Sequence, residues 1–194
     1  MLEAAGTGRL RIFGPGLNRI CFTHVDNYCH GLVIAERALY PKSPALGKFY
    51  ITTDGRTHPG GEQYLVFWKE MDRAVVGMGF PSLWAKFHYP IWLLNPGARV
   101  CQLIGYLAGT TLKLNPFNVR VLTMHRWFDI AAAEKDLGFE PIIAYDAGWT
   151  ETIAWFKANW LPTYAKTTSL FGIAEQSQAK IDIQEASRQA HLKN

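Results

Sequence analysis

The sequence lacks long runs of any one chemical kind. Only 19% of its 194 residues are charged, and no stretch of about 18 uninterrupted apolar residues occurs, which argues against a membrane-spanning helix. The 20 basic and 16 acidic residues are spread along the chain, so no Lys- and Arg-rich run supports nucleic-acid binding. The first residues, MLEAAGTGRLRIFG, carry an acid and glycines where a signal peptide needs a basic end and an apolar run, so we expect no export.

Cysteines are also few. Cys21, Cys29 and Cys101 are an odd number without CxxC spacing, which favours a reducing, intracellular location over a disulfide framework. What the chain does have is apolar: 48% of its residues are hydrophobic and 13% aromatic, which predicts a globular interior. The last part is rich in Gln, Ser, Ala and Lys. We expect one folded part, residues 1–165, and a polar tail, residues 166–194, that is mobile or loosely helical.

The stretch FTHVDNYCHG, residues 22–31, contains two histidines, an aspartate and a cysteine, which are all residue types that bind zinc. Its context favours another interpretation. RICFTHV is typical of a strand and NYCHGLVIAERAL of a helix, with Asp26 or Asn27 as the N-cap. Cys29 and His30 would then point about 100° apart on that helix. We therefore expect a strand, a cap and a helix here, and no metal site.

Hydrophobic periodicity predicts strands alternating with helices, which is typical of an α/β layer structure. In the helix expected over residues 62–76, apolar side chains recur at three- and four-residue steps, as on a surface that faces a core. The expected strands are residues 9–13, 19–25, 48–53 and 119–122. The expected helices are residues 2–5, 28–39 and 62–76, a segment capped by Asp129 that ends before Gly138, and a segment capped by Asp146 that ends at Pro162.

Two apolar segments, residues 84–94 and 100–109, are separated by Pro96 and Gly97. Each is about as long as a buried or interfacial helix. The proline and the glycine favour a hinged or buried pair of helices over one long helix on a membrane surface. Association of residues 80–109 with a membrane surface stays open as an alternative.

Three segments in a fixed order resemble the second half of an extended short-chain dehydrogenase/reductase. They are CFTHVDN with its helix, GKFYITTDG, and FDIAAAEKDLGFEPIIAYDAGWTETIAWF. Within that superfamily the chain is most similar to the 3β-hydroxysteroid dehydrogenases and the sterol-4α-carboxylate 3-dehydrogenases, whose apolar insertion resembles residues 80–109. The resemblance implies an α/β fold, namely the C-terminal part of a Rossmann-type enzyme with an incomplete parallel sheet and a substrate-binding subdomain.

The resemblance also indicates the chemistry of the substrate. Relatives that act on nucleotide sugars usually carry an arginine two residues before the aromatic residue of the first of these strands, where it pairs with phosphate. Here Phe22 is the aromatic residue and Ile20 holds that position, which suits a sterol or another apolar alcohol. In the neighbouring register, Arg19 would hold it.

Such enzymes hold NAD or NADP on a glycine-rich turn, and a tyrosine assisted by a lysine four residues later accepts the substrate proton. The turns that begin at Gly6 and Gly14 lack the final glycine of the pattern and do not join a first strand to a helix. None of the eight tyrosines has lysine four residues later. We therefore expect no catalytic and no cofactor-binding residue in this chain. NAD or NADP would be bound in the complete enzyme, through a half that precedes Met1.

Substrate contacts are expected from the apolar insertion, from the residues just before the third motif, and from the first strand. The expected substrate-binding residues are Ile20, Trp84, Tyr89, Trp92, His125, Arg126 and Trp127. Ordinary core packing is the alternative for each aromatic residue, because large aromatic side chains are mostly buried whatever their role.

Two functions fit these observations. The first is the substrate-binding portion of an NAD(P)-dependent 3β-hydroxysteroid or sterol dehydrogenase, which oxidises a 3β-hydroxyl when complete; the resemblance places it inside the cell, at the cytosolic side of the endoplasmic reticulum membrane. The second is a non-catalytic sterol- or lipid-binding or interaction module. If half of a parallel sheet is missing, strand 19–25 or 48–53 would expose unpaired backbone, so we expect poor solubility of this chain alone. The particular sterol, the choice between NAD and NADP and the oligomeric state stay open.

Overall fold

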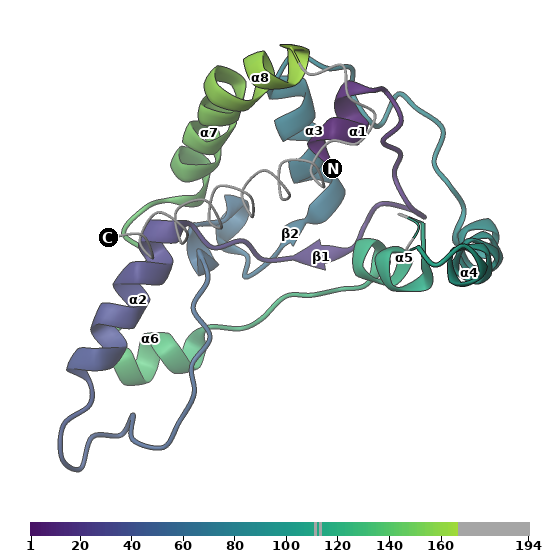
Figure 1. The fold of residues 1–194 in the computed structure, drawn as a ribbon. Helices are drawn as coiled ribbons and strands as arrows, with labels where there is room; N and C mark the ends of the chain where they lie inside the picture. Colours follow the sequence, from purple (N-terminus) through teal and green to yellow (C-terminus); the bar gives the residue numbers. More distant parts are fainter. Residues whose placement is uncertain (111, 113, 167–194) are drawn as a thin grey trace, which may run out of the picture.

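The computed structural model describes residues 1–110, 112 and 114–166, whose fold is mostly helical (Figure 1). The helices are α1 (Leu2–Gly6), α2 (Val25–Arg37), α3 (Phe67–Gly77), α4 (Ile91–Leu107), α5 (Pro116–Thr123), α6 (Ala131–Leu137), α7 (Tyr145–Trp155) and α8 (Leu161–Lys166), with 3-10 turns η1 (Gly55–Thr57) and η2 (Pro59–Gly61) and a π-helical turn η3 (Phe156–Trp160). The strands are β1 (Arg19–Ile20) and β2 (Leu65–Val66). The short N-terminal helix is confirmed. The predicted polar tail lies outside the described residues, apart from the last residue of α8.

The described residues contain one sheet of two short strands, and it is antiparallel. β1 pairs with β2 in a register that places Ile20 opposite Leu65. Two isolated bridges are parallel, and they join Phe13 to Tyr89 and Ile20 to Arg126. The prediction of an incomplete parallel sheet is therefore wrong for the part of the chain that the structure describes.

The segment 48–53, expected as a strand, belongs to no sheet of the described residues. At its end, the Asp54 N–H donates to the Phe22 carbonyl at 3.0 Å. A β-strand forms only where a neighbouring strand accepts and donates its backbone hydrogen bonds, so β-branched and aromatic residues are not sufficient. For the same reason, the strand expected over residues 19–25 is reduced to β1.

α2 begins before its predicted start, and the prediction of Asp26 or Asn27 as its N-cap is wrong. His24 is the N-cap, and its Nδ1 accepts from the Asp26 N–H at 3.2 Å. Asn27 lies inside the helix and is fully buried. Its amide donates to Asp54 Oδ1 at 2.7 Å and to the Ile143 carbonyl at 2.8 Å. The Asn27 side chain therefore bonds to residues far away in the sequence, although its local capping preference predicted it at the start of the helix.

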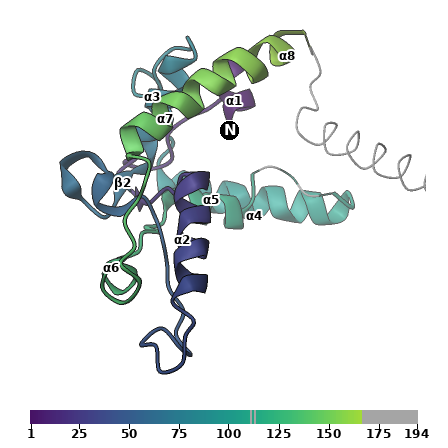
Figure 2. The ribbon, with the colours of Figure 1, turned by 90° about the vertical axis from the view of Figure 1, so that its left-hand side faces the viewer.

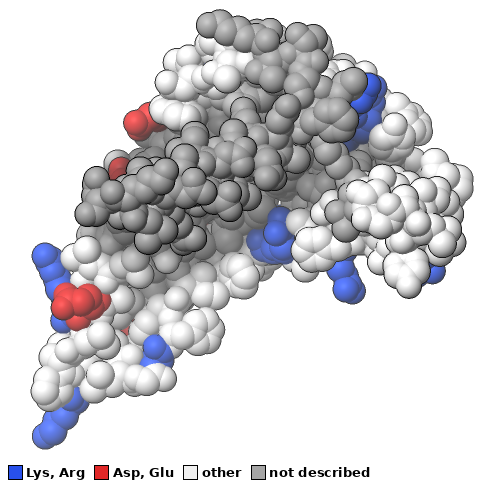
Figure 3. Space-filling model, in the orientation of Figure 1, with Lys and Arg blue, Asp and Glu red and all other residues white. Residues whose placement is uncertain are grey.

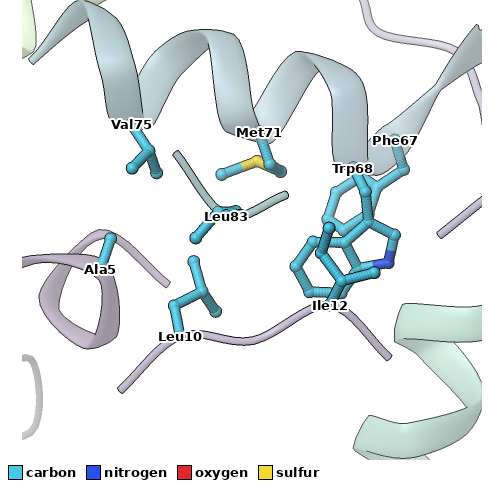
Figure 4. Close-up of a cluster of buried hydrophobic side chains, with 8 residues drawn as sticks. All are labelled: Ala5, Leu10, Ile12, Phe67, Trp68, Met71, Val75 and Leu83. Carbon is cyan, nitrogen blue, oxygen red and sulfur yellow. The ribbon is translucent and has the colours of Figure 1, made fainter. Parts of the chain in front are cut away.

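The main core lies between α3 and the N-terminal segment (Figure 4). Trp68 and Val75 of α3 are fully buried, as are Ile12 and Leu83, which they face. The other members are Ala5, Leu10, Phe67 and Met71. The predicted core-facing surface of α3 is confirmed, although the helix begins at Phe67 and not at residue 62.

α4 and α5 pack together at one end of the molecule, away from α2 and α6 (Figure 1). Leu94 of α4 and Val119 of α5 are buried in their contact. α5 replaces the predicted strand VRVL. Asn115 caps it, with Oδ1 accepting from the Asn118 N–H at 2.8 Å, and Pro116 is its first residue. Both are strong signals for a helix start, and they override the β-branched residues that follow.

α4 is one continuous helix, although the sequence predicted two (Figure 2). Pro96 lies within it, near its start, where the missing N–H removes one hydrogen bond and the helix still continues to Leu107. None of the helices described has both the length and the apolar content that a membrane crossing requires.

The C-terminal helical segment also differs from its prediction. α7 begins at Tyr145, and Asp146 lies in its first turn, where it pairs with Arg73 of α3 and does not cap the helix. η3 and α8 extend α7 past Pro162, the predicted end (Figure 2). Pro162 follows the π-helical turn, where the regular hydrogen-bond pattern is already interrupted. By contrast, α6 ends as predicted at Gly138, whose φ is 63°.

Candidate functional site

The predicted site residues fall into two groups. The first group lies on the β1 ribbon, which we define as residues 19–20 together with residues 125–127. Ile20 and Arg126 are bridge partners. The Arg126 N–H donates to the Arg19 carbonyl at 2.7 Å, and the Arg19 N–H donates to His125 Nδ1 at 3.1 Å. These hydrogen bonds join two segments that lie far apart in the sequence.

Side chains alternate across the β1 ribbon. Bridge partners share a face, so Ile20 and Arg126 lie together, and Ile20 packs against the main core. The opposite face carries Arg19, whose guanidinium carbon lies 4.3 Å from the centre of the Tyr64 ring. That ring is 5.6 Å from the ring of Trp127, which is 39% exposed. Ile20 and Trp127 therefore belong to opposite faces, and the Trp127 face is the more open one.

Tyr64 and Arg19 belong to this open face, and the sequence interpretation did not include them as site residues. Tyr64 shares the apolar spacing of α3, which predicted a core position, but it lies before β2 and outside the helix. The guanidinium of Arg19 lies over the Tyr64 ring, and this cation–π contact holds Arg19 against the Tyr64–Trp127 pair. Only the pairing of β1 with β2 reveals this arrangement, and no local sequence signal reports that pairing.

Two polar residues at the β1 ribbon, Arg126 and the neighbouring Cys21, are at least partly buried. Arg126 Nε is buried and has no hydrogen-bond partner among the described residues. Burial raises the pKa of the Cys21 thiol above its ordinary value, and the nearby Arg126 charge opposes that shift only in part. Cys21 is therefore a protonated thiol at neutral pH and a poor nucleophile.

The second group surrounds an open hollow at the start of α4, which we call the Trp92 hollow. It has a volume of about 380 Å³ and is lined by Gly14, Pro15, His88, Pro90, Ile91 and Trp92. Trp92 is 75% exposed, so its indole face is available to a ligand. Tyr89 flanks the hollow, and its carbonyl accepts from the Gly14 N–H at 2.8 Å. The Trp84 ring lies 5.3 Å from the ring of His88. A hollow of this volume with a mainly apolar lining suits a small apolar ligand.

The two groups form separate sites. Within the described residues, no hydrogen bond or ring contact joins the β1 ribbon to the Trp92 hollow. Phe13 ties the hollow to the main core, since its ring lies 6.4 Å from that of Tyr89 and 6.1 Å from that of Trp68. The structure therefore places Trp92 in the lining of the hollow, Tyr89 next to it in sequence and Trp84 against the lining residue His88, and it leaves the ribbon residues as a second surface.

A further hollow, of about 380 Å³, lies between α4 and α5 and was not predicted. Its lining is Gln102, Gly105, Tyr106, Thr110, Leu112, Asn115, Pro116 and Phe117. The sequence interpretation missed it because residues 119–122 were expected as a strand, and the hollow exists only because α5 packs against α4.

Two tyrosines, Tyr50 and Tyr145, make hydrogen bonds to carboxylates that keep their hydroxyls protonated. Lys48 and Tyr50 approach each other, but both bind Asp136 Oδ2, at 2.7 Å and 2.9 Å. Partial burial and the hydrogen bond to Asp136 raise the pKa of Tyr50, whereas a catalytic tyrosine needs a lowered one. Burial and the neighbouring Glu70 carboxylate raise the pKa of Tyr145 well above its usual range. Both tyrosines therefore hold their protons at neutral pH.

The glycines that could approach a dinucleotide do not form its binding turn. Gly14 and Gly16 have φ values of 67° and 72°, but they lie in the loop before β1 and no helix follows them directly. A Cβ at Gly14 would lie 2.8 Å from the Ile91 side chain, so the space beside this glycine is filled by α4. NAD or NADP does not fit these residues, because its pyrophosphate needs glycine backbone at a helix N-terminus.

Two of the zinc-type residues of FTHVDNYCHG, His24 and Asp26, interact at the start of α2. His24 Nδ1 lies 3.8 Å from Asp26 Oδ2 and caps α2. The part of the chain that the structure describes contains no group of three or more residues that could hold a metal ion.

Comparison with known proteins relates the chain to sterol enzymes. No protein-family model matches it. It is 26% identical over 163 residues to the human sterol-4-alpha-carboxylate 3-dehydrogenase, decarboxylating, which is 81% of this chain and 41% of that protein. The Arabidopsis thaliana 3beta-hydroxysteroid-dehydrogenase/decarboxylase isoform 1 is 31% identical over 162 residues, 79% of this chain and 35% of that protein. The Mycobacterium tuberculosis 3 beta-hydroxysteroid dehydrogenase/Delta 5-->4-isomerase is 26% identical over 160 residues, 80% of this chain and 40% of that protein.

The chain spans between 27% and 44% of the length of the curated relatives that it matches. Among solved structures, the crystal structure of gox2253 matches with a TM-score of 0.52 and 20% identity, over 81% of this chain and 42% of that one. This likeness supports the fold of the matched part. The chain is therefore a distant homologue of the 3β-hydroxysteroid dehydrogenases and sterol-4α-carboxylate 3-dehydrogenases, and it corresponds to part of an extended short-chain dehydrogenase/reductase.

Proposed function

We propose that this chain is the substrate-binding portion of an NAD(P)-dependent 3β-hydroxysteroid or sterol dehydrogenase. The observation that carries the proposal is the relation to enzymes of that name along about four fifths of the chain. In the complete enzyme, NAD or NADP, held by residues outside this chain, would supply the hydride-acceptor chemistry for oxidation of a 3β-hydroxyl. The hydroxyl proton goes to a base outside these 194 residues, because no tyrosine here is followed by lysine four positions later.

In this proposal the Trp92 hollow binds the apolar skeleton of a sterol or another apolar alcohol. Trp92 and Ile91 supply apolar surface, and burying that surface drives binding. Trp84 packs against His88, the polar side chain of the lining, and the Tyr89 carbonyl accepts from the Gly14 N–H, so both residues support the lining from outside. The Trp127 face of the β1 ribbon, to which His125 also belongs, is a second contact surface for the substrate. Ile20 and Arg126 lie on the other face and support the ribbon from the core side.

Sterol binding to the purified chain tests this assignment. Titration with cholesterol in detergent micelles should change the tryptophan fluorescence of the wild-type chain. Trp92→Ala should weaken binding by about tenfold, as expected for an aromatic anchor. Trp155→Ala is the matched control, because Trp155 is 58% exposed on α7, away from the hollow, and its loss should leave the affinity unchanged. Equal affinities for Trp92→Ala and the wild type would refute the role of the hollow.

A non-catalytic sterol- or lipid-binding or interaction module is the second candidate. The raised pKa of Tyr50 and Tyr145 and the missing dinucleotide turn favour it for this chain alone. The two candidates differ in their response to cofactor. If the chain acts only as a module, sterol affinity stays the same whether or not the remaining part of a related dehydrogenase and NAD⁺ or NADP⁺ are added. If it is the substrate-binding portion, those additions produce oxidation of the sterol that depends on the oxidised cofactor and forms NADH or NADPH.

We also propose that α4 lies on a membrane surface, at the cytosolic side of the endoplasmic reticulum. Its exposed apolar side chains include Tyr106 at 84% and Leu107 at 77% exposure. Arg99 is the one charged residue of α4. The α4–α5 end is mostly uncharged in Figure 3, with basic side chains beside it. Anionic liposomes should therefore sediment the chain, and a Tyr106→Lys, Leu107→Lys double variant should stay in the supernatant. Equal sedimentation of both proteins would exclude α4 as the contact.

A further inference from the structure

The lining of the Trp92 hollow contains one side chain that can both donate and accept a hydrogen bond, namely His88. Most of the remaining lining consists of glycine, proline and isoleucine, whose side chains have no hydrogen-bonding group. The indole of Trp92 adds a single N–H donor. His88 therefore determines most of the polar chemistry that the side chains of the hollow offer to a ligand.

The His88 imidazole has no hydrogen-bond partner among the described residues. Its side chain is half-buried, and its printed contact is the ring of Trp84. By contrast, the imidazoles of His24, His58 and His125 each bond to a backbone group through Nδ1. A polar ring on the wall of an apolar hollow, with both nitrogens unused, is available to an oxygen atom of a ligand.

The surroundings of His88 are ordered before a ligand binds. The Gly14 N–H donates to the Tyr89 carbonyl at 2.8 Å, and the Tyr89 N–H donates to the Ile12 carbonyl at 2.9 Å, so the two segments beside the hollow are joined by their backbones. The ring centres of His88 and Trp84 lie 5.3 Å apart, with the ring planes at 69°. A ring that is already held in place loses little conformational freedom on binding, so its hydrogen bond adds to affinity.

We propose that His88 is a specificity-determining residue, whose ring bonds an oxygen at the end of the steroid skeleton opposite the 3β-hydroxyl. This inference rests on the proposed function, in which NAD or NADP is held outside this chain and the carbon that bears the 3β-hydroxyl faces it. The Trp92 hollow is lined by this chain, so it receives the other end of the skeleton.

The chemistry of imidazole decides which ligand end the hollow favours. The neutral ring has one N–H donor and one acceptor nitrogen, so it bonds a ketone or a hydroxyl equally well. A hydrocarbon end removes water from both nitrogens of His88 and returns no hydrogen bond, which lowers the affinity. The hollow therefore favours a steroid that is oxygenated at this end over a sterol with a hydrocarbon side chain.

Two steroids that differ by one oxygen test this proposal. The probe 3β-hydroxy-5α-androstan-17-one carries a ketone at the far end, and 5α-androstan-3β-ol carries only hydrogen there. Calorimetry measures the affinity of the full chain for each probe, and the ratio of the two affinities is compared between the wild type and His88→Phe. This comparison cancels the difference in hydration between the probes. The ratio should be about tenfold higher in the wild type, and equal ratios would overturn the proposal.

Further variants separate recognition from packing. His88→Phe keeps an aromatic ring against Trp84 and removes both nitrogens, so its affinity for the probe without the ketone should stay near that of the wild type. His88→Gln, which can donate and accept, should restore much of the preference for the ketone. His30→Phe makes the same change on α2, outside the lining, and should keep the wild-type ratio. An equal loss of affinity for both probes in His88→Phe and in His88→Gln would show a packing role and overturn the proposal.

The failure of this inference can be told apart from the failure of the proposed function. A ketone preference that depends on His88, without oxidation of either probe after addition of the remaining part of a related dehydrogenase and NAD⁺ or NADP⁺, would overturn the dehydrogenase role and leave the His88 role standing. Oxidation of the probes together with equal affinity ratios would do the reverse. An absence of binding of both probes to the wild-type chain would overturn both.

Discussion

At the scale of single residues, the Asn27 side chain joins three segments of the chain. Its amide donates to Asp54 Oδ1 and to the Ile143 carbonyl, and its Oδ1 accepts from the Ile143 N–H at 2.8 Å. Asp54 Oδ1 also accepts from the His24 N–H at 2.8 Å. One buried amide therefore joins the start of α2, the turn after residues 48–53 and the segment before α7.

Replacement of Asn27 by alanine should destabilise the chain by about 2–4 kcal/mol, because the buried Asp54 carboxylate loses one of its two hydrogen bonds and the Ile143 peptide group loses both of its bonds to the Asn27 side chain. Asn159→Ala is the control: Asn159 is exposed and makes one hydrogen bond, to the Trp155 carbonyl, so its loss should cost less than about 0.5 kcal/mol. Urea unfolding followed by fluorescence measures both. Similar midpoints for the two variants would show that the Asn27 network contributes little.

His58 makes stability depend on pH in the range below neutrality. The residue is 2% exposed, its Nδ1–H donates to the Glu62 carbonyl at 3.1 Å, and its Nε2 has no partner among the described residues. Burial lowers the pKa of His58, and the Asp54 charge opposes this shift only in part. Below about pH 6.5 the unfolded chain binds a proton that the folded chain does not bind, so the free energy of unfolding decreases by up to about 1.4 kcal/mol per pH unit.

The His58 contribution is present above the unfolded pKa and is lost as the pH falls through the folded pKa. Urea titrations between pH 7.5 and 5 should show this decrease in the wild type and a smaller one in His58→Gln. An identical slope in His58→Gln and the wild type would assign the effect to other groups.

At the scale of secondary-structure elements, two helical glycines should respond to alanine in opposite ways. A Cβ at Gly97 in α4 meets nothing within 4 Å, so Gly97→Ala should stabilise the chain by about 1 kcal/mol through helix propensity. A Cβ at Gly148 in α7 would lie 2.7 Å from His24 Cδ2, so Gly148→Ala should cost about 1–3 kcal/mol despite the same propensity gain. Thermal unfolding compares the pair, and a gain at both positions would refute the close contact between α7 and the cap of α2.

The elements that the sequence predicted well are those with local signals. α3 has its apolar spacing, and α6 has Asp129 Oδ1 accepting from the Ala131 N–H at 2.7 Å and Gly138 in the left-handed conformation. The elements predicted wrongly depend on partners. Residues 48–53 have strand composition and no ladder, and α4 continues past Pro96 because the residues after it pack against α5.

At the scale of the whole molecule, exposed apolar surface should cause self-association. Large apolar side chains are exposed on both α2 and α4. Light scattering of the purified chain should show a mass that increases with concentration, and a Tyr106→Lys, Leu107→Lys double variant should shift it toward the monomer. An Ala154→Lys, Ala158→Lys variant adds the same charge at exposed positions and should not. A wild-type chain that stays monomeric and melts cooperatively would contradict this prediction.

The relationship could be inferred from the amino-acid order alone. The order of three motifs indicated the superfamily, and no tyrosine is followed by lysine four residues later, because both observations depend only on which residues follow one another. The three-dimensional fold was needed to show that His24 caps α2, that Ile20 and Trp127 lie on opposite faces of the β1 ribbon, and that Trp92 lines a hollow whose His88 contacts Trp84. These features depend on hydrogen bonds and packing between segments far apart in the chain, and no local pattern of residues encodes them.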